Sequence, residues 1–353
     1  MKYMGMNQYI INENATLIEA LKQLNQLSGK QMVLLVTNET GVMTGTLTDG
    51  DVRRALLGNV ALSAMVKDAM HRDFKAIKTD DVDVKMMRQC RLKGIGILPH
   101  LNEDGTIKAI YDLTVTKAVL PLSAILMAGG KGERLRPLTL NTPKPLLEIG
   151  GKAIIDYNIE ALASVGVKDI TVTTRYLAEQ IHNHFALPVA GVEVKCVTET
   201  MPLGTIGAAS LVPRSEGGNT LVMNSDLLTT ISFEEMYMRH IEEQADVTIA
   251  AIPYVVSVPY AILTTDGAQV KGIEEKPSYS YYANAGIYIF SNALLDTVPN
   301  DSRTDATDLI EQAINKGLKV VYYPISGTWI DVGSPNDFKQ AQDLMRHHND
   351  LIK

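Results

Sequence analysis

The sequence predicts an α/β protein in which a Rossmann-like, mostly parallel sheet is flanked by helices and preceded by a small α+β domain. Apolar strands alternate with amphipathic helices after Pro121, the pattern of a parallel sheet covered on both faces. Before Pro121, two similar half-units follow each other, which indicates an internal repeat. A length of 353 residues is enough for two or three domains. We therefore expect a first domain over residues 1–120 and a second over residues 121–353.

The two half-units before Pro121 share one order of elements over about 60 residues. The first half is predicted to contain a helix from Thr16, a strand over residues 32–36, a strand leading into residues 45–51, and a helix from Val52. Thr16 and Glu19 have the spacing of a capping box, which supports that helix start. The second half is predicted to repeat the strands over residues 95–98 and 107–111 and then to begin another helix. Aligning Asp49 with Asp112 brings the halves into register.

The elements after Pro121 are expected in regular alternation. Strands are predicted over residues 124–127, 170–174, 192–197 and 220–224, and helices over residues 154–165, 177–185 and 205–211. From about Ala245 strands predominate, and a last helix is expected over residues 335–347. Ligands of such sheets bind at the carboxyl ends of the strands, so functional residues are expected there.

Composition excludes several classes of protein. The net charge of −7 argues against a general nucleic-acid binder. The N-terminus lacks a signal-peptide core, and no run of 18 apolar residues occurs, so we expect no membrane span. The two cysteines, Cys90 and Cys196, lie far apart and suggest neither a disulfide framework nor a zinc site. These features favour a cytoplasmic protein.

The most informative segment is a glycine-rich turn directly after a predicted strand. It runs from Leu126 to Thr139 as LMAGGKGERLRPLT and is followed by KPLL from Lys144. Glycines at such a position let backbone N–H groups surround phosphate oxygens. Between residues 129 and 147 lie four basic residues and one acidic residue, namely Lys131, Arg134, Arg136, Lys144 and Glu133. A locally positive turn in an acidic protein suits a triphosphate. The alternative is an ordinary glycine turn with solvated charges.

Two aspartates are candidate metal ligands. Asp226 ends the apolar strand at residues 221–224, and Asp331 lies in the segment WIDVG. A carboxylate at a strand end beside a phosphate-binding turn is a natural ligand for Mg²⁺. Taken singly, each aspartate is better explained as a turn or cap residue than as a metal ligand. Together with the basic turn, they favour a metal site.

These motifs resemble the signature of the sugar-1-phosphate nucleotidyltransferases, G-G-x-G-x-R-L-x-P-L-T followed by P-K-P-L. The resemblance covers about residues 123–347 and extends to the family's W-x-D-x-G motif, whose Asp shares the metal. The family usually has N-G-D where this chain has Asn224, Ser225 and Asp226, so Ser225 is a departure that leaves the Asp in place. The resemblance implies a GT-A-like fold.

The resemblance also implies roles for individual residues. The nucleotide would be bound by Ala128, Gly129, Gly130, Gly132, Glu199 and Gly204, with Gly204 in a turn lining the nucleobase pocket. The sugar phosphate would be bound by Glu275, Lys276, Asn284 and Gly286. Arg134, Lys144 and Asp226 would be catalytic, and Asp226 and Asp331 would hold Mg²⁺.

The reaction implied is nucleotidyl transfer from a nucleoside triphosphate to a sugar 1-phosphate, releasing pyrophosphate. Members of this family with a small domain in front of the transferase domain resemble glucosamine-1-phosphate or mannose-1-phosphate guanylyltransferases. We therefore favour guanylyl transfer from GTP to a hexose or hexosamine 1-phosphate, for glycan or nonulosonate precursor synthesis. Uridylyl and thymidylyl transfer are open alternatives. A protein that binds nucleotide without catalysing transfer is a further alternative, although the charged residues are all present.

The N-terminal half-units resemble a CBS-domain pair. In that family a strand end of the form G-x-x-T-x-x-D binds adenine nucleotides, and Gly45, Thr48 and Asp51 match it. The second half has Tyr111 and Thr114 at the corresponding positions, so one adenine-nucleotide site at most is expected. The family habit also implies a homo-oligomer. A purely structural or dimerising module is the alternative.

Overall fold

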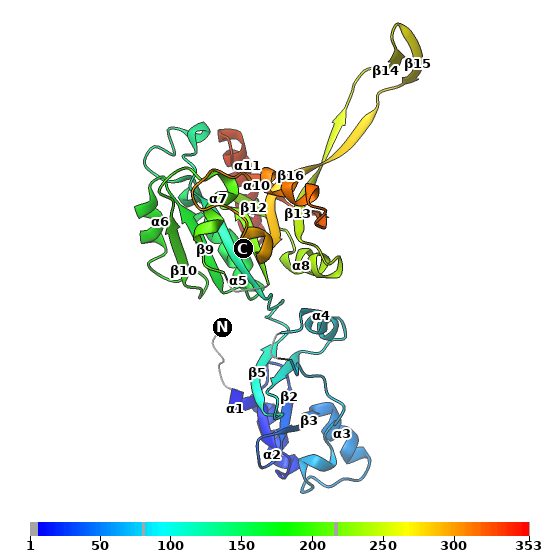
Figure 1. Cartoon of the computed structure of the whole chain (residues 1–353). Coiled ribbons are helices and arrows are strands. Elements are labelled where there is room, and N and C mark those ends of the chain that lie inside the picture. The colour runs from blue at the N-terminus through cyan, green and yellow to red at the C-terminus, as the bar shows by residue number, and fades with distance from the viewer. Residues whose placement is uncertain (1–5, 80–81, 215–217, 353) are drawn as a thin grey trace. The chain divides into compact units, whose positions relative to one another are not determined.

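The computed structural model describes residues 6–79, 82–214 and 218–352. The chain forms two compact units, Met1–Leu120 with Ser164–Gly166, and Pro121–Ala163 with Val167–Lys353 (Figure 1). None of the helices in the described ranges is long and apolar enough to cross a bilayer.

The first unit contains two half-units with the same strand order. The first half comprises α1 (Met6–Tyr9), β1 (Ile10–Asn12), α2 (Leu17–Gln26), β2 (Val33–Thr37), β3 (Met43–Thr48), α3 (Asp49–Leu57) and the 3₁₀ helix η1 (Val66–Asp68). The second comprises α4 (Val84–Leu92), β4 (Ile97–Leu101) and β5 (Ile107–Asp112). In the first half β1 pairs with β2 in parallel, and in the second Ile77 bridges His100 in parallel. Each half then forms an antiparallel pair with one bulge, β2–β3 and β4–β5.

The prediction of a helix after Asp112 is wrong. The chain turns at residues 113–115 and continues without regular structure to residue 121. In the first half, Thr48 and Asp51 form a reciprocal capping box that starts α3. The second half has Tyr111 and Thr114 in their places, and the Asp112 carboxylate instead accepts hydrogen bonds from Thr114, closing a local turn. A local turn of this kind competes with helix formation.

The second unit is built on a seven-stranded sheet in the order β10-β9-β6-β11-β16-β13-β17. Its strands are β6 (Leu122–Ala128), β9 (Asp169–Thr174), β10 (Val194–Thr198), β11 (Asn219–Asn224), β13 (Val247–Ser257), β16 (Ser278–Ser291) and β17 (Val320–Pro324). All neighbours pair in parallel except the two contacts of β16. The prediction of a mostly parallel sheet is thus refined to a mixed one. Because β16 returns from β13 through a hairpin, it must run antiparallel.

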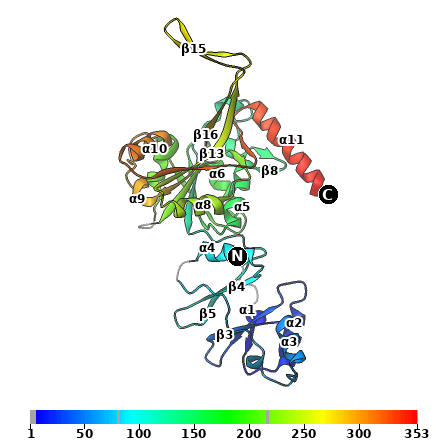
Figure 2. The same ribbon diagram turned by 90° about the vertical axis from the view of Figure 1, so that its right-hand side faces the viewer.

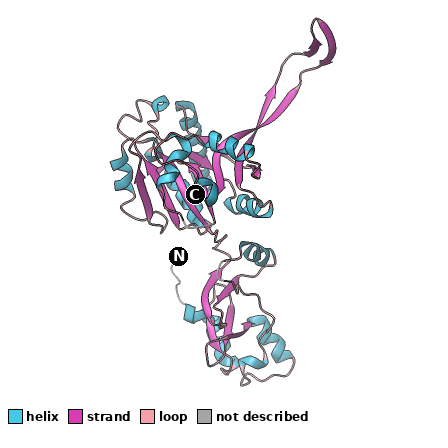
Figure 3. Cartoon of the chain, viewed as in Figure 1, coloured by secondary structure: helices cyan, strands magenta, loops and turns pink. Residues whose placement is uncertain are grey.

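Helices flank this sheet (Figures 2 and 3). They are α5 (Ile154–Ser164), α6 (Ala178–His184), α7 (Gly204–Gly207), α8 (Phe233–Glu242), α9 (Asn292–Leu295), α10 (Ala306–Asn315) and α11 (Pro335–Ile352), with 3₁₀ helices η2 (Glu133–Leu135), η3 (Lys144–Leu146) and η4 (Ala208–Leu211). The helix predicted over residues 205–211 is therefore split between α7 and η4. Three two-stranded ladders complete the unit: β7 (Glu148–Ile149) with β8 (Lys152–Ala153), β12 (Leu227–Thr229) with β18 (Trp329–Asp331), and β14 (Ile262–Asp266) with β15 (Gln269–Glu274).

The carboxyl ends of the central parallel strands lie side by side. Ala128 at the end of β6 is in register with Thr174 of β9, and Met127 is in register with Asn224 of β11. β6 and β11 are mainly buried aliphatic residues such as Leu221, and β9 alternates buried aliphatic residues with buried threonines, as expected for strands covered on both faces. The turns that follow them, with their polar side chains, are therefore brought to one edge of the sheet.

Candidate active site

The glycine-rich turn leaves β6 at this edge. Gly132 has φ +60°, and a Cβ there would lie 3.0 Å from the Thr139 methyl group and 3.2 Å from Lys144 Cβ. The Thr139 hydroxyl donates to the Gly132 carbonyl at 2.8 Å and fixes the turn. At Gly130, by contrast, an added Cβ would meet nothing within 4 Å. The backbone at Gly130 therefore faces open space, whereas Gly132 is needed for a left-handed conformation in a tight fit.

A cavity of about 650 Å³ opens beside the turn. A volume of this size is typical of small-molecule sites. Its walls come from the turn and from the ends of β6, β9 and β11. Among the residues predicted from sequence, the lining includes Ala128, Gly129, Gly130, Gly132, Arg134, Lys144, Glu199, Gly204 and Asp226. The sequence motifs for the nucleotide thus meet in one hollow.

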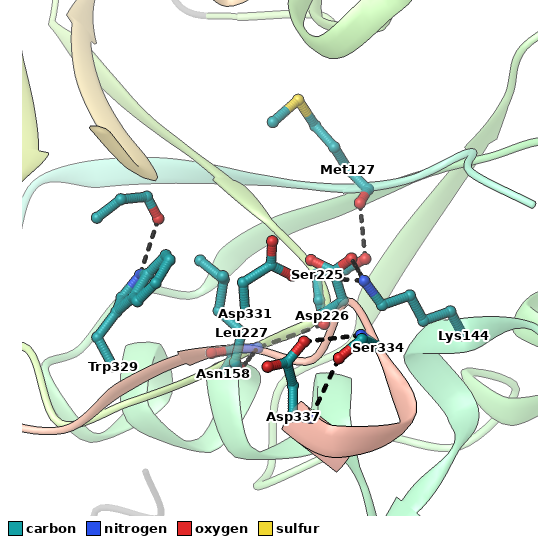
Figure 4. Close-up of polar contacts among 11 residues, drawn as sticks. Met127, Lys144, Asn158, Ser225, Asp226, Leu227, Trp329, Asp331, Ser334 and Asp337 are labelled. Atoms are coloured by element: carbon teal, nitrogen blue, oxygen red, sulfur yellow. Dashed lines mark hydrogen bonds and ion pairs between the residues drawn. The ribbon is translucent and has the colours of Figure 1, made fainter. Parts of the chain in front are cut away.

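Lys144 lies between the two predicted metal ligands. Its side chain is only 11% exposed, and its ammonium pairs closely with Asp226 Oδ2 and lies 3.5 Å from Asp331 Oδ1 (Figure 4). The other Asp226 oxygen, Oδ1, is buried and has no hydrogen-bond partner among the described residues. Burial and the neighbouring Asp226 charge raise the pKa of Asp331, against the opposing effects of Lys144 and Arg134. The two carboxylates therefore share one cation, and both are partly exposed to solvent.

A short ladder brings these aspartates together. β12 and β18 pair antiparallel with Leu227 opposite Asp331, and the Val332 N–H donates to the Asp226 carbonyl at 3.2 Å. The Asn158 amide, buried on α5, donates to the Leu227 carbonyl at 2.9 Å (Figure 4). Ser225, the departure from the family pattern, donates its hydroxyl to the Met127 carbonyl at 2.6 Å. Ser225 thus ties the end of β11 to β6 and leaves Asp226 facing the cavity.

Arg134 lies over the backbone after Asp331. A Cβ on Gly333 would lie 3.2 Å from a guanidinium nitrogen of Arg134, so the glycine allows the side chain its place. Both residues line the cavity. Arg134 therefore adds a positive charge to the cavity wall near Asp331, which is not itself among the residues that line the cavity.

Glu199 and Gly204 form another wall. The Glu199 carboxylate is buried, and a Cβ on Gly129 would lie 2.5 Å from its Oε1. Burial raises the pKa of Glu199, and the Leu203 N–H and Arg175 oppose that shift. Gly204 has φ +83°, and a Cβ there would lie 2.5 Å from the Thr304 carbonyl oxygen. Glycine is therefore required at position 204, whereas a side chain at position 129 would displace the end of the Glu199 side chain.

The predicted sugar-phosphate residues are divided. Gly286, at φ +70°, packs against the side chain of Asn224, which lines the cavity, and its N–H donates to Asn284 Oδ1 at 3.0 Å. Glu275 and Lys276 instead lie between β15 and β16, on a ribbon that extends away from the sheet (Figure 1), and they do not line the cavity. None of the four therefore lines the cavity. Gly286 lies behind Asn224, and Asn284 lines a separate hollow of about 390 Å³ together with Tyr282 and Tyr322.

Sequence reasoning missed two arginines that line the cavity, Arg175 and Arg303. Arg175 directly follows Thr174 at the carboxyl end of β9, so the strand-end rule could have identified it. Its Nε is buried and has no hydrogen-bond partner within the described part of the chain. Arg303 precedes α10 and pairs with Asp305 at 2.9 Å, and nothing in its local sequence marks it.

Comparison with known proteins identifies the family. The model of the family described as "Nucleotidyl transferase" matches residues 123–348. The chain belongs to the nucleotidyl transferase family. This places the glycine turn, Lys144 and both aspartates inside the matched region, and it accounts for the α/β fold of the second unit.

Two curated relatives of this nucleotidyl transferase carry the same name. It is 31% identical over 223 residues to "Mannose-1-phosphate guanylyltransferase catalytic subunit beta" of Drosophila melanogaster, covering 61% of this chain and 60% of that protein. It is 30% identical over 232 residues to the protein of that name from Dictyostelium discoideum, covering 63% and 64%. The matched part thus spans about three fifths of these relatives.

The fold also matches a solved structure, HddC from Yersinia pseudotuberculosis. The TM-score is 0.50 at 24% identity, covering 63% of this chain and 98% of that one. This likeness concerns the fold of the nucleotidyl transferase unit.

Proposed function

We propose that this chain transfers a guanylyl group from GTP to a hexose or hexosamine 1-phosphate, releasing pyrophosphate and giving a nucleotide sugar. The observation that carries the proposal is the meeting of Lys144, Asp226 and the glycine turn in one cavity. Membership of the nucleotidyl transferase family and the names of the relatives support this class of reaction. The product would serve glycan or nonulosonate synthesis in the cytoplasm.

The chemistry asks the protein to hold two anions in line. The sugar phosphate is already anionic, so it can attack the α-phosphorus without a general base. Catalysis then depends on orientation and on neutralising charge as pyrophosphate leaves. Backbone N–H groups of Gly130–Gly132 would hold the β and γ phosphates, Arg134 would face the departing pyrophosphate, and Lys144 would face the α-phosphate.

The carboxylate pair fits Mg²⁺. No cluster of three or more His, Cys, Asp or Glu side chains suited to a metal occurs in the described ranges. Mg²⁺ is usually held by one or two carboxylates together with substrate phosphates, so Asp226 and Asp331 suffice. The buried Asp226 Oδ1 without a partner is the kind of oxygen that such an ion would satisfy. When bound, Mg²⁺ would lower the negative charge on the α-phosphate.

The carboxylate of Glu199 in the cavity wall favours guanine as the base that the cavity binds. An ionised carboxylate only accepts hydrogen bonds, and guanine offers two adjacent donors, N1–H and the N2 amino group. Uracil and thymine offer one N–H between two carbonyl oxygens, so one carbonyl would face a carboxylate oxygen. Two donors from guanine would also stabilise the ionised form of Glu199, whose pKa burial raises. Uridylyl or thymidylyl transfer remains the alternative.

A pyrophosphate-release assay with four triphosphates and several sugar 1-phosphates tests the proposal. We expect GTP to give the highest kcat/KM. Glu199→Gln should lower the preference for GTP over UTP by about a hundredfold, because a Gln amide matches the uracil edge. The control is Glu193→Gln, which changes an exposed glutamate just before β10. An unchanged preference would remove Glu199 from base selection. Nucleotide binding without turnover on any pair would favour a non-catalytic nucleotide sensor.

We further propose that the N-terminal unit is a CBS-domain pair that regulates the enzyme by binding an adenine nucleotide near Thr48 and Asp51. The repeated strand order of its two halves supports this assignment. The Thr48 hydroxyl and an Asp51 oxygen lie 2.6 Å apart in the cap of α3, so a ligand would have to share them. This proposal is tested by calorimetry of the full chain with AMP, ADP and ATP. The absence of heat on adding these nucleotides would count against the site.

A further inference from the structure

Arg175 lies beside Glu199 at the carboxyl edge of the central sheet. Thr174 at the end of β9 is in register with Thr198 of β10, and the Glu199 N–H donates to the Thr174 carbonyl at 2.8 Å, so the pairing continues past both strands. Neighbouring strands of a sheet lie about 4.8 Å apart, and residues side by side in a parallel pair share a face. Arg175 and Glu199 therefore leave the sheet as neighbours on one face.

A glycine stands next to this pair. Ala128 of β6 is in register with Thr174 on the other side of β9, which places Gly129 next to Arg175. The Glu199 carboxylate extends as far as this glycine, because its Oε1 lies 2.5 Å from the position of a Cβ on Gly129. Arg175, Glu199 and Gly129 all line the cavity. The edge formed by β10, β9 and β6 thus offers a ligand an acceptor, a donor and a place without a side chain.

The Arg175 guanidinium has a donor that no group of the protein uses. Its Nε is buried and has no hydrogen-bond partner among the described residues. Leaving a buried donor without a partner is costly, and a ligand that supplies an acceptor removes that cost. Burial raises the pKa of Glu199, and the Arg175 charge is near enough to oppose that rise. The two side chains therefore act on the same small region of the cavity.

Guanine carries groups in the order that this edge can bind. Its 2-amino group and N1–H are donors, and O6 is the acceptor next to N1. When the two donors lie on the Glu199 carboxylate, O6 is the next atom along the base, as Arg175 is the next side chain along the sheet edge. Adenine has an amino group at this position, which would face the guanidinium with a second donor.

We propose that Arg175 is a specificity-determining residue that donates a hydrogen bond to O6 of guanine while Glu199 accepts from N1–H and the 2-amino group. This proposal rests on the guanylyl transfer proposed above and assigns the 6-oxo group of the base to one side chain. Arginine suits this contact because its guanidinium is always charged and holds its donors in one plane. In complexes of proteins with DNA, a basic side chain on guanine O6 is the commonest specific contact.

The test compares three triphosphates that share the ribose and the phosphates. 6-Thio-GTP has sulfur, a weak acceptor, in place of O6, and ITP keeps O6 and N1–H but lacks the 2-amino group. The kcat/KM for pyrophosphate release is measured for both and for GTP with one sugar 1-phosphate. The wild-type chain should prefer GTP over 6-thio-GTP by about ten- to a hundredfold. Arg175→Met should bring this ratio close to one and leave the ratio of GTP to ITP unchanged, because Glu199 contacts the 2-amino group.

The matched control is Lys195→Met, which removes a positive charge from β10 outside the cavity. The Lys195 side chain is 70% exposed and pairs with Asp169 at 2.8 Å, so both ratios should keep their wild-type values. Arg175→Lys covers the case in which the methionine variant misfolds. It keeps the charge but not the planar set of donors, so it should lower the preference for GTP over 6-thio-GTP by a smaller factor. Circular dichroism checks the fold of each variant.

A wild-type ratio of GTP to 6-thio-GTP in the folded Arg175 variants would overturn the proposal. An equal loss of kcat/KM with all three nucleotides would also overturn it, because that result would assign Arg175 to the triphosphate. A failure of the proposed function looks different: the wild-type chain would then turn over fastest with UTP or another triphosphate, or not at all. Dissociation constants of the three nucleotides, measured by calorimetry without a sugar phosphate, supply the same ratios where no pyrophosphate is released.

Discussion

Lys144→Met removes the ammonium from between Asp226 and Asp331 while keeping most of the side-chain volume. Losing one partner of a fully buried ion pair costs about 3–5 kcal/mol, because a charge remains without compensation. Here Lys144 is 11% exposed, but the carboxylates are 23% and 40% exposed, so water screens part of the loss. We therefore expect about 2–3 kcal/mol lower stability and a Tm lower by roughly 5–10 °C.

The assay is thermal unfolding with and without Mg²⁺, beside the rate of pyrophosphate release. The control is Lys152→Met, which breaks a 2.7 Å pair with Glu160 in which both side chains are more than a third exposed. That change should cost less than about 1 kcal/mol. Lys144→Met should also lower the rate about a hundredfold or more, and Mg²⁺ should restore part of its stability. If both variants unfolded at one temperature, Lys144 would not be offsetting buried negative charge.

Two further predictions concern Asp331 and Gly204. Burial raises the pKa of Asp331 in the folded state above the ordinary 3.8. Between the unfolded-state pKa and this higher folded-state pKa, the folded state binds more protons than the unfolded state. The free energy of unfolding therefore falls as pH rises through this range. Asp331→Asn should flatten this slope in urea unfolding between pH 4 and 7, and an unchanged slope would contradict the assignment. Gly204→Ala places a Cβ 2.5 Å from the Thr304 carbonyl and should cost about 1–3 kcal/mol and raise the KM for the triphosphate. Gly191→Ala is the control, because Gly191 has φ +76° and an added Cβ there would meet nothing within 4 Å. This variant carries the backbone strain without the clash, so an equal loss of stability in the two variants would show that the clash is unimportant.

The convergence of the glycine turn and Asp226 at one cavity could be predicted because its determinants are local. β6 and β11 are continuous apolar runs, and the turns after them carry the glycines and Asp226. Parallel pairing brings such ends to one edge, so strand order alone places the turn beside the aspartate. Asp331 could be named but not positioned, because its place depends on the β12–β18 ladder between segments far apart in the sequence.

The ribbon that extends from the sheet could not be predicted, because its strands lack the usual alternation of apolar and polar residues. Tyr254, Val255 and Val256 follow one another, which in a sequence indicates a strand buried on both faces. In the structure these residues are exposed, on a ribbon that also carries Glu275 and Lys276 away from the cavity. The pattern of apolar residues in a sequence predicts how apolar a strand is, and it does not predict whether other elements cover that strand.

The charge of the cavity is likewise a product of the fold. The chain carries −7 overall, yet the residues that line the cavity include four basic side chains, Arg134, Lys144, Arg175 and Arg303, and three acidic ones, Glu133, Glu199 and Asp226. Only two of the basic residues come from the glycine-rich segment. Arg175 directly follows β9, and Arg303 lies in the loop before α10. A triphosphate entering this cavity would meet cations from three separate parts of the chain, and that concentration allows an acidic protein to bind a polyanion.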